Sequence, residues 1–154
     1  MSKFINNLKD HFKKIILLDG SPHRASLSFA IGIFIAFAPH LGLHTLSAIG
    51  VAWLLRLNLP IMLMGAFVNN PWTLLPIYGF CLCLGNYLLG NGFSCLPPEL
   101  TGGELIEFLK DSPIPFVVGT LAAGIVAATL SYFVVKRILF LMHFQDKKDT
   151  INSI

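Results

Sequence analysis

The amino-acid sequence predicts an all-α fold: a polytopic helical membrane protein with broken or re-entrant half-helices. From Ala25 to Pro98 the chain carries one charged side chain, Arg56, and no Asp, Glu or Lys. A soluble domain cannot continue that long without charge, because surface positions recur at every helical turn or every second strand residue. Breaks in the helices, which membrane proteins tolerate only where protein or a polar cavity satisfies the backbone, are indicated by Pro39, Pro60, Pro71 and Pro76.

Composition bounds the class of protein. With 154 residues, 55% of them hydrophobic, the chain is expected to form one small membrane domain. The net charge of +3 comes from basic residues near both ends, beside the apolar segments. Anionic lipid headgroups are therefore the expected partners, and no nucleic acid is expected. Cys81, Cys83 and Cys95 lack the spacing of a zinc site and are interpreted as small apolar side chains.

Residues 1–20 are predicted to form an amphipathic helix that lies in the membrane interface. Apolar residues recur there at helical spacing, opposite polar and basic residues. The same pattern also fits a helix packed against the rest of the domain. Asp19 and Gly20 should end this helix. Ser21 followed by Pro22 is the expected start of the next one, with Ser21 as the N-cap residue.

The membrane domain is assigned to residues 21–135, with an apolar core of broken helices at residues 25–90. Its first helix enters lipid near Ala25 and meets Pro39 after roughly 21 Å, which is short of the ~30 Å hydrocarbon core. Further apolar segments follow, each too short or interrupted by proline: 43–55, 59–68 and 74–89. Close approach of another helix to the first is favoured by a stripe of small residues, Ser28, Gly32 and Ala36.

The C-terminal part is predicted to hold an acidic loop at residues 91–115, an uninterrupted spanning helix at residues 116–135 and a basic tail at residues 136–154. The basic ends place both termini in the cytoplasm, in a bacterial inner membrane. Residues 25–90 must then cross an odd number of times, unless the acidic loop is also cytoplasmic. A second small stripe should be buried against protein and suggests a homo-oligomer: Gly119, Ala123, Ala127 and Ser131.

The candidate binding residues lie where a new helix begins after each break. Thr45 is expected to cap the first of these helices, and Asn70 before Pro71 the second. Helix N-termini present unpaired N–H groups and partial positive charge, so both are candidate anion sites inside the membrane. The predicted substrate-binding residues are Arg24, His44, Thr45, Arg56, Asn70 and Thr73, and the predicted structural breaks are Pro39, Gly42 and Pro71.

Each of these residues also has a purely structural interpretation. Arg24 and Arg56 can mark segment ends and extend toward headgroups. Asn70 and Thr73 can satisfy backbone groups that nearby prolines leave free. Two aromatic residues, Trp72 and Tyr78, can act as interfacial anchors.

The sequence gives little support for metal binding or catalysis. His40 and His44 have the i, i+4 spacing of a metal pair, but Pro39 and Gly42 interrupt the continuous helix that such a pair needs. No metal and no cofactor are therefore predicted. The apolar run also lacks Asp, Glu and Lys, and no Ser or Cys has a base at motif spacing, so the chain is not expected to be an enzyme.

Several motifs occur in a fixed order: SPHR at 21–24, IGIF at 31–34, P-x-x-G-x-H-T at 39–45, RLN at 56–58 and NP-x-T at 70–73. Because of these motifs, the chain resembles the bacterial membrane family catalogued as domain of unknown function 2062, over about residues 19–135. The resemblance implies a small integral inner-membrane protein without an assigned activity. Some members of that family look fused to glycosyltransferase domains, which implies lipid-linked sugar or polyprenyl-phosphate metabolism.

The sequence therefore predicts a protein that binds or translocates an anionic, lipid-like substrate at intramembrane half-helix N-termini. A polyprenyl-phosphate-linked molecule is one candidate substrate. The alternative is a non-catalytic membrane scaffold or assembly partner, in which the breaks and polar residues are structural.

Overall fold

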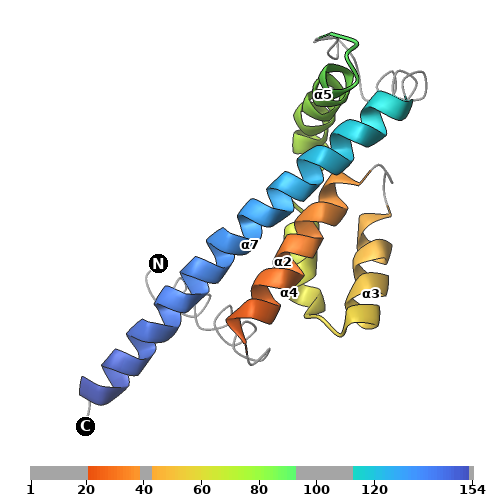
Figure 1. The fold of residues 1–154 in the computed structure, drawn as a ribbon. Helices are drawn as coiled ribbons and strands as arrows, with labels where there is room; N and C mark the ends of the chain where they lie inside the picture. The colour runs from red at the N-terminus through yellow and green to blue at the C-terminus, as the bar shows by residue number, and fades with distance from the viewer. Residues whose placement is uncertain (1–20, 39–42, 93–112, 153–154) are drawn as a thin grey trace.

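The computed structural model describes residues 21–38, 43–92 and 113–152 of the chain. These residues form helices and no strand, which confirms the predicted all-helical class. The helices are α2 (Pro22–Phe37), α3 (His44–Leu55), α4 (Leu59–Ala66), α5 (Pro71–Leu88) and α7 (Pro113–Asn152) (Figure 1). The predicted interfacial helix at residues 1–20, most of the predicted acidic loop and the predicted breaks at Pro39 and Gly42 lie outside the described residues.

α2 begins and ends where proline chemistry predicts. Ser21 is extended (φ −151°, ψ 126°) and Pro22 opens the helix, although the Ser21 side chain makes no cap hydrogen bond. Ala38 leaves the helical region (φ −65°, ψ 142°). A residue before proline is disfavoured in the α conformation, because its backbone collides with the proline ring, and Pro39 follows directly.

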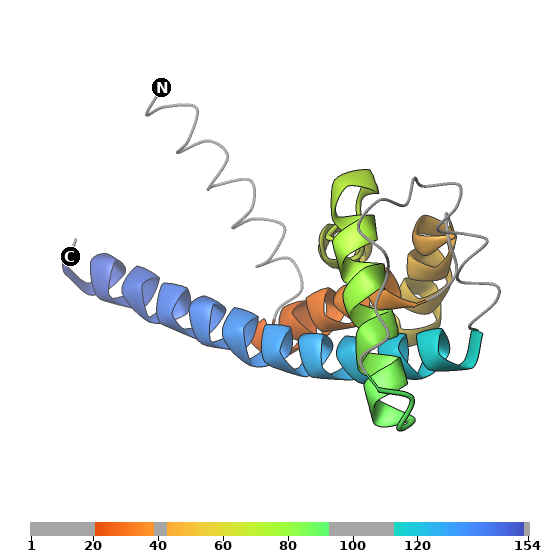
Figure 2. The ribbon, with the colours of Figure 1, turned by 90° about the horizontal axis from the view of Figure 1, so that it is seen from above.

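The long helix α7 organises the other helices (Figures 1 and 2). α2 lies antiparallel along it, because Ala25 packs with Leu139 near the start of α2 whereas Phe37 meets Gly124 near its end. α4 packs on α2, and α3 returns beside α4. α5 crosses the N-terminal part of α7 (Figure 2).

Glycine lets the backbones touch at two helix crossings. A Cβ atom on Gly32 of α2 would lie 2.0 Å from the carbonyl oxygen of Met62 in α4. A Cβ on Gly119 of α7 would lie 1.7 Å from the carbonyl oxygen of Cys81 in α5, and one on Gly85 would lie 1.7 Å from that of Pro115. The first small stripe, and Gly119 and Ala123 of the second, are thus buried, and their contacts are with helices of the same chain, whereas Ala127 and Ser131 are half-buried. They give no argument for a homo-oligomer.

Two helices continue through positions where the sequence predicted an end or a break. α7 begins three residues before the predicted residues 116–135 and continues to Asn152, through the segment predicted as a separate basic tail. Nothing after Pro115 breaks it, and Lys and Arg are good helix formers. α5 likewise continues through Pro76, where an interruption was predicted. A proline inside a helix costs one backbone hydrogen bond without always ending the helix.

The exterior of the described chain is strongly apolar. One helix segment, Pro113–Leu141, is long and apolar enough to cross a membrane, and only 28% of its apolar window is buried. The apolar helices Pro22–Phe37, His44–Leu55 and Trp72–Leu88 are shorter. Large apolar side chains stand exposed on α3, α5 and α7, among them Trp53 at 83% and Trp72 at 90%.

Cys83 departs from the predicted role of the cysteines. It is disulfide-bonded, whereas Cys81 is a free, buried thiol. The spacing of the cysteines gave no sign of this bond, because disulfide pairing depends on the distance between Cβ atoms in the fold. Of the two cysteines that the structure describes, Cys81 therefore fits the interpretation as a small apolar side chain, and Cys95 lies outside the described residues.

Candidate functional site

The C-terminal end of α2 is satisfied by two side chains from elsewhere in the chain. Asn69 Nδ2 donates to the carbonyl oxygen of Ala36 at 2.7 Å, and the Tyr78 hydroxyl donates to that of Ala38 at 3.5 Å. Both side chains are buried. Since the last carbonyls of a helix lack partners within it, these bonds allow α2 to stop inside an apolar environment.

Sequence reasoning missed the roles of both residues. Tyr78 is fully buried and stacks edge-on against Phe116, with ring centroids 5.1 Å apart. The interpretation of Tyr78 as an interfacial anchor is therefore wrong, while the exposure of Trp72 fits it. The paired Asn69 and Asn70 were the available signal. Only Asn70 stands before a proline, so only Asn70 was recognised as a helix-end residue.

The N-terminus of α5 is closed by its own residues. The Asn70 side chain accepts from the backbone N–H groups of Trp72 (2.9 Å) and Thr73 (3.1 Å), and the Thr73 hydroxyl accepts from the backbone N–H of Asn70 (2.9 Å). This capping box confirms the predicted cap. Because Pro71 has no N–H, the first turn offers no unused donor to an anion. Asn70 and Thr73 thus have the structural role that was the alternative to binding.

The N-terminus of α3 is different. The helix begins at His44, and the residue before it, Leu43, provides no side-chain cap. Thr45 is exposed in the first turn. The prediction that Thr45 caps this helix is wrong, because a capping side chain must come from the residue that precedes the helix. Within the described residues, no capping side chain therefore neutralises the partial positive charge of this end.

A cavity of about 280 Å³ lies between the start of α3, the end of α4 and the start of α5. One wall is polar, and Asn69 Nδ2 stands 3.4 Å from His44 Nε2 in it. Asn69 Oδ1 is buried and makes no hydrogen bond within the part of the chain that the structure describes. The lining comprises His44, Thr45, Asn69 and Asn70 on the polar side and Leu63, Ala66, Phe67 and Leu74 on the apolar side.

Arg24 and Arg56 lie far from this cavity. The Arg24 guanidinium donates to the carbonyl oxygen of Arg56, which ends α3 in the left-handed conformation (φ 52°). α3 has 12 residues, so its two ends are about 18 Å apart at 1.5 Å per residue. The six predicted binding residues therefore do not form one site: His44, Thr45, Asn70 and Thr73 gather at one end of α3 and the two arginines at the other.

The two arginines belong to a basic end of the molecule. Near them, His23 Nδ1 meets the Tyr132 hydroxyl of α7 at 2.8 Å, which brings Lys136 and Arg137 to the same level. These four cations are the charged residues among the described side chains, at residues 21–38, 43–92 and 113–141; no Asp or Glu lies in those ranges. The described part of the molecule is thus basic at one end and has the partly polar cavity toward the other.

Comparison with known proteins gives one match. A family model described as "uncharacterized protein conserved in bacteria" (DUF2062) matches residues 6–148, a longer stretch than the motifs alone had indicated. No curated protein and no solved structure matches the chain. Within the described residues, no group of three or more His, Cys, Asp or Glu side chains could hold a metal ion.

Proposed function

We propose from the geometry of this chain, which belongs to this uncharacterised bacterial family, that it is a small inner-membrane protein. It binds or translocates an anionic, lipid-like molecule, with the headgroup in the cavity at the start of α3. The observation that carries the proposal is a cavity with one polar and one apolar wall, which opens among exposed apolar side chains. Such surroundings suit a ligand with one polar and one apolar part.

The apolar exterior supports placement in a membrane. Soluble monomers rarely expose large contiguous apolar patches, whereas here exposed apolar side chains cover several helices. The four described cations gather at one end, as expected of a cytoplasmic face. This placement makes the protein multi-pass, with the start of α2 and the distal part of α7 on the cytoplasmic side.

The chemistry of the cavity favours an anionic headgroup with hydroxyl groups. The N-terminus of α3 contributes partial positive charge, and His44 and Thr45 contribute polar side-chain atoms beside it. No acidic side chain among the described residues opposes an anion there. The buried Asn69 Oδ1 is an acceptor, and buried acceptors without partners are rare, so a ligand hydroxyl that reached it would add stability.

The test compares two ligands with the same tail. Farnesyl phosphate and farnesol differ by the phosphate, and binding of each to the detergent-purified protein is measured by native mass spectrometry. His44→Ala and Thr45→Val should weaken farnesyl phosphate binding about tenfold, as expected for loss of one charge-assisted hydrogen bond, and leave farnesol binding unchanged. Ser47→Ala, on the same helix but outside the cavity lining, is the matched control. Equal binding of farnesyl phosphate by all variants would contradict the proposal.

A membrane scaffold is the second candidate function. It is favoured by the capping box at Asn70 and Thr73, and by Asn69 and Tyr78 at the end of α2, because all four side chains satisfy backbone groups. In a scaffold, the exposed apolar side chains of α3 would meet a partner helix. Copurification of a stoichiometric membrane partner, together with a failure to bind either farnesyl ligand, would favour this function.

A further inference from the structure

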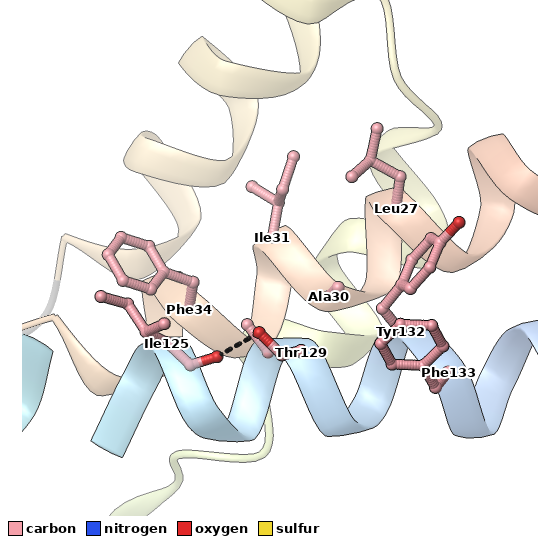
Figure 3. A pocket seen from close by; sticks show the side chains of 9 residues that line it. Leu27, Ala30, Ile31, Phe34, Ile125, Thr129, Tyr132 and Phe133 are labelled. Atoms are coloured by element: carbon pink, nitrogen blue, oxygen red, sulfur yellow. Dashed lines mark hydrogen bonds between the residues drawn. The ribbon is translucent and has the colours of Figure 1, made fainter. Parts of the chain in front are cut away.

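A groove of about 440 Å³ opens between α2 and α7 (Figure 3). Its lining is mostly apolar, with Leu27, Ile31 and Phe34 contributed by α2 and Ile125 and Phe133 by α7. The Thr129 hydroxyl in the groove donates to the carbonyl oxygen of Ile125 at 2.7 Å, so it is engaged within its own helix. A groove of this kind suits a hydrocarbon chain better than a polar ligand.

One end of the groove is polar and positively charged. Tyr132 lines it there, and its hydroxyl stands 2.8 Å from His23 Nδ1. Lys136 Nζ lies over the same ring, 5.3 Å from its centroid. No Asp or Glu occurs among the side chains that the structure describes, so none of these neutralises Lys136. An external anion at this end would therefore meet a cation that has no acidic competitor among the described side chains.

We propose that this groove holds one acyl chain of an anionic glycerophospholipid, whose phosphate is bound by Lys136 beside the His23–Tyr132 pair. The inference rests on the proposed placement in a membrane, but not on ligand binding in the cavity at the start of α3. From Leu27 to Phe34 the groove follows α2 for about 10 Å, roughly a third of the ~30 Å hydrocarbon core. The lipid would thus belong to the leaflet at the basic end.

The positive charge at one end of the groove favours an anionic phospholipid over a second copy of the chain as its occupant. Copies of a membrane protein insert in one orientation, because the distribution of basic residues sets it. A second copy at this groove would therefore bring its own Lys136 and arginines to the same level, where like charges repel. An anionic lipid brings opposite charge to the Lys136 end and apolar surface to the rest of the groove.

The first test compares two variants, each of which removes one positive charge, at neighbouring positions of α7. Lys136→Gln and Arg137→Gln remove the same charge from exposed residues of α7, but successive side chains point about 100° apart around a helix. Native mass spectrometry of the full chain measures binding of phosphatidylglycerol and phosphatidylcholine with identical acyl chains. Lys136→Gln should weaken phosphatidylglycerol binding about fivefold, from about 1 kcal/mol per basic residue. It should weaken phosphatidylcholine binding less, because the choline of that lipid balances the charge of its phosphate, and Arg137→Gln should have less effect on phosphatidylglycerol. Equal losses for the two variants, or none, would overturn the proposal.

The second test fills the groove. Thr129 is exposed, so Thr129→Trp should block the acyl chain without disturbing the helix interface, while Leu121→Trp adds the same bulk on α7 outside the groove. The first variant should lower phosphatidylglycerol binding, and the second should not. A wild-type dimer that becomes monomeric only on Thr129→Trp would assign the groove to a second copy and overturn the proposal. If instead the His44 and Thr45 variants bind farnesyl phosphate normally, only the proposed function fails.

Discussion

At the scale of single residues, several polar side chains in and beside the apolar run form hydrogen bonds at a helix end. Asn70 and Thr73 close α5, Asn69 closes α2, and Arg24 donates to the carbonyl oxygen at the end of α3. In water, solvent can satisfy such groups, but in lipid the chain must do so itself. The main role of these polar residues is therefore to satisfy the backbone groups at helix ends, which allows the helices to be short.

Asn70 makes the sharpest residue-scale prediction. Asn70→Ala should lower the free energy of unfolding by about 1 kcal/mol, because the N–H groups of Trp72 and Thr73 lose their acceptor. Asn70→Ser should restore most of this loss, since serine also caps. Thermal unfolding in detergent measures both. Equal melting temperatures for the wild type, Asn70→Ala and Asn70→Ser would mean that this cap does not contribute to stability.

A change at Asn69 should cost more. Asn69→Leu leaves the carbonyl oxygen of Ala36 buried without its donor, which is expected to cost about 1 to 3 kcal/mol. Trp72→Leu, at a neighbouring site that is 90% exposed, should change stability by less than about 0.5 kcal/mol. Denaturant titration in a fixed micelle would compare the two. Similar effects would mean that the bond to Ala36 contributes little.

The sequence predicted some of these residues and not others for a physical reason. Asn70 and Pro71 form a local signal, because cap and first helical residue are adjacent. Asn69 and Tyr78 act on a helix that lies more than thirty residues earlier in the chain, and no local pattern encodes that distance. Thr45 was misplaced by two positions, because the N-cap residue of α3 is Leu43. Such errors matter only at caps, where one residue decides the role of a side chain.

At the scale of elements, two glycines in helix interiors should respond in opposite ways to the same change. Gly119→Ala brings a Cβ to 1.7 Å from the carbonyl oxygen of Cys81, so α5 and α7 must separate and the protein should be destabilised by several kcal/mol. Gly50→Ala in α3 meets no atom within 4 Å and should stabilise the helix by up to about 1 kcal/mol. The melting temperatures of the two variants are measured in the same detergent. A shift of the same sign for both would contradict the close backbone contact between α5 and α7 at Gly119.

The elements were more predictable than their contacts. Proline positions set the start of α2, its end and the start of α5, because proline restricts its own backbone and that of the residue before it. The small stripes correctly indicated close helix packing. They could not indicate which helix packs there, and the partners are α4 and α5 of the same chain rather than another copy.

At the scale of the whole molecule, the gathered cations predict an orientation. In a background without native cysteines, Lys147→Cys should be labelled from the cytoplasmic side and Asn91→Cys, after the end of α5, from the opposite side. Labelling of both positions from the same side in intact cells and inverted vesicles would exclude the orientation.

The shortness of α2 has a consequence for the lipid around it. Its 16 residues span about 24 Å, whereas the bilayer core is about 30 Å thick. Hydrophobic mismatch of this size is relieved by local thinning of the bilayer. In the proposed orientation, α2 starts at the cytoplasmic face, so the thinned region lies over the end of α2, beside the cavity at His44 and Asn69. A headgroup that leaves this cavity then has a shorter hydrocarbon path to water than it would have in undisturbed membrane.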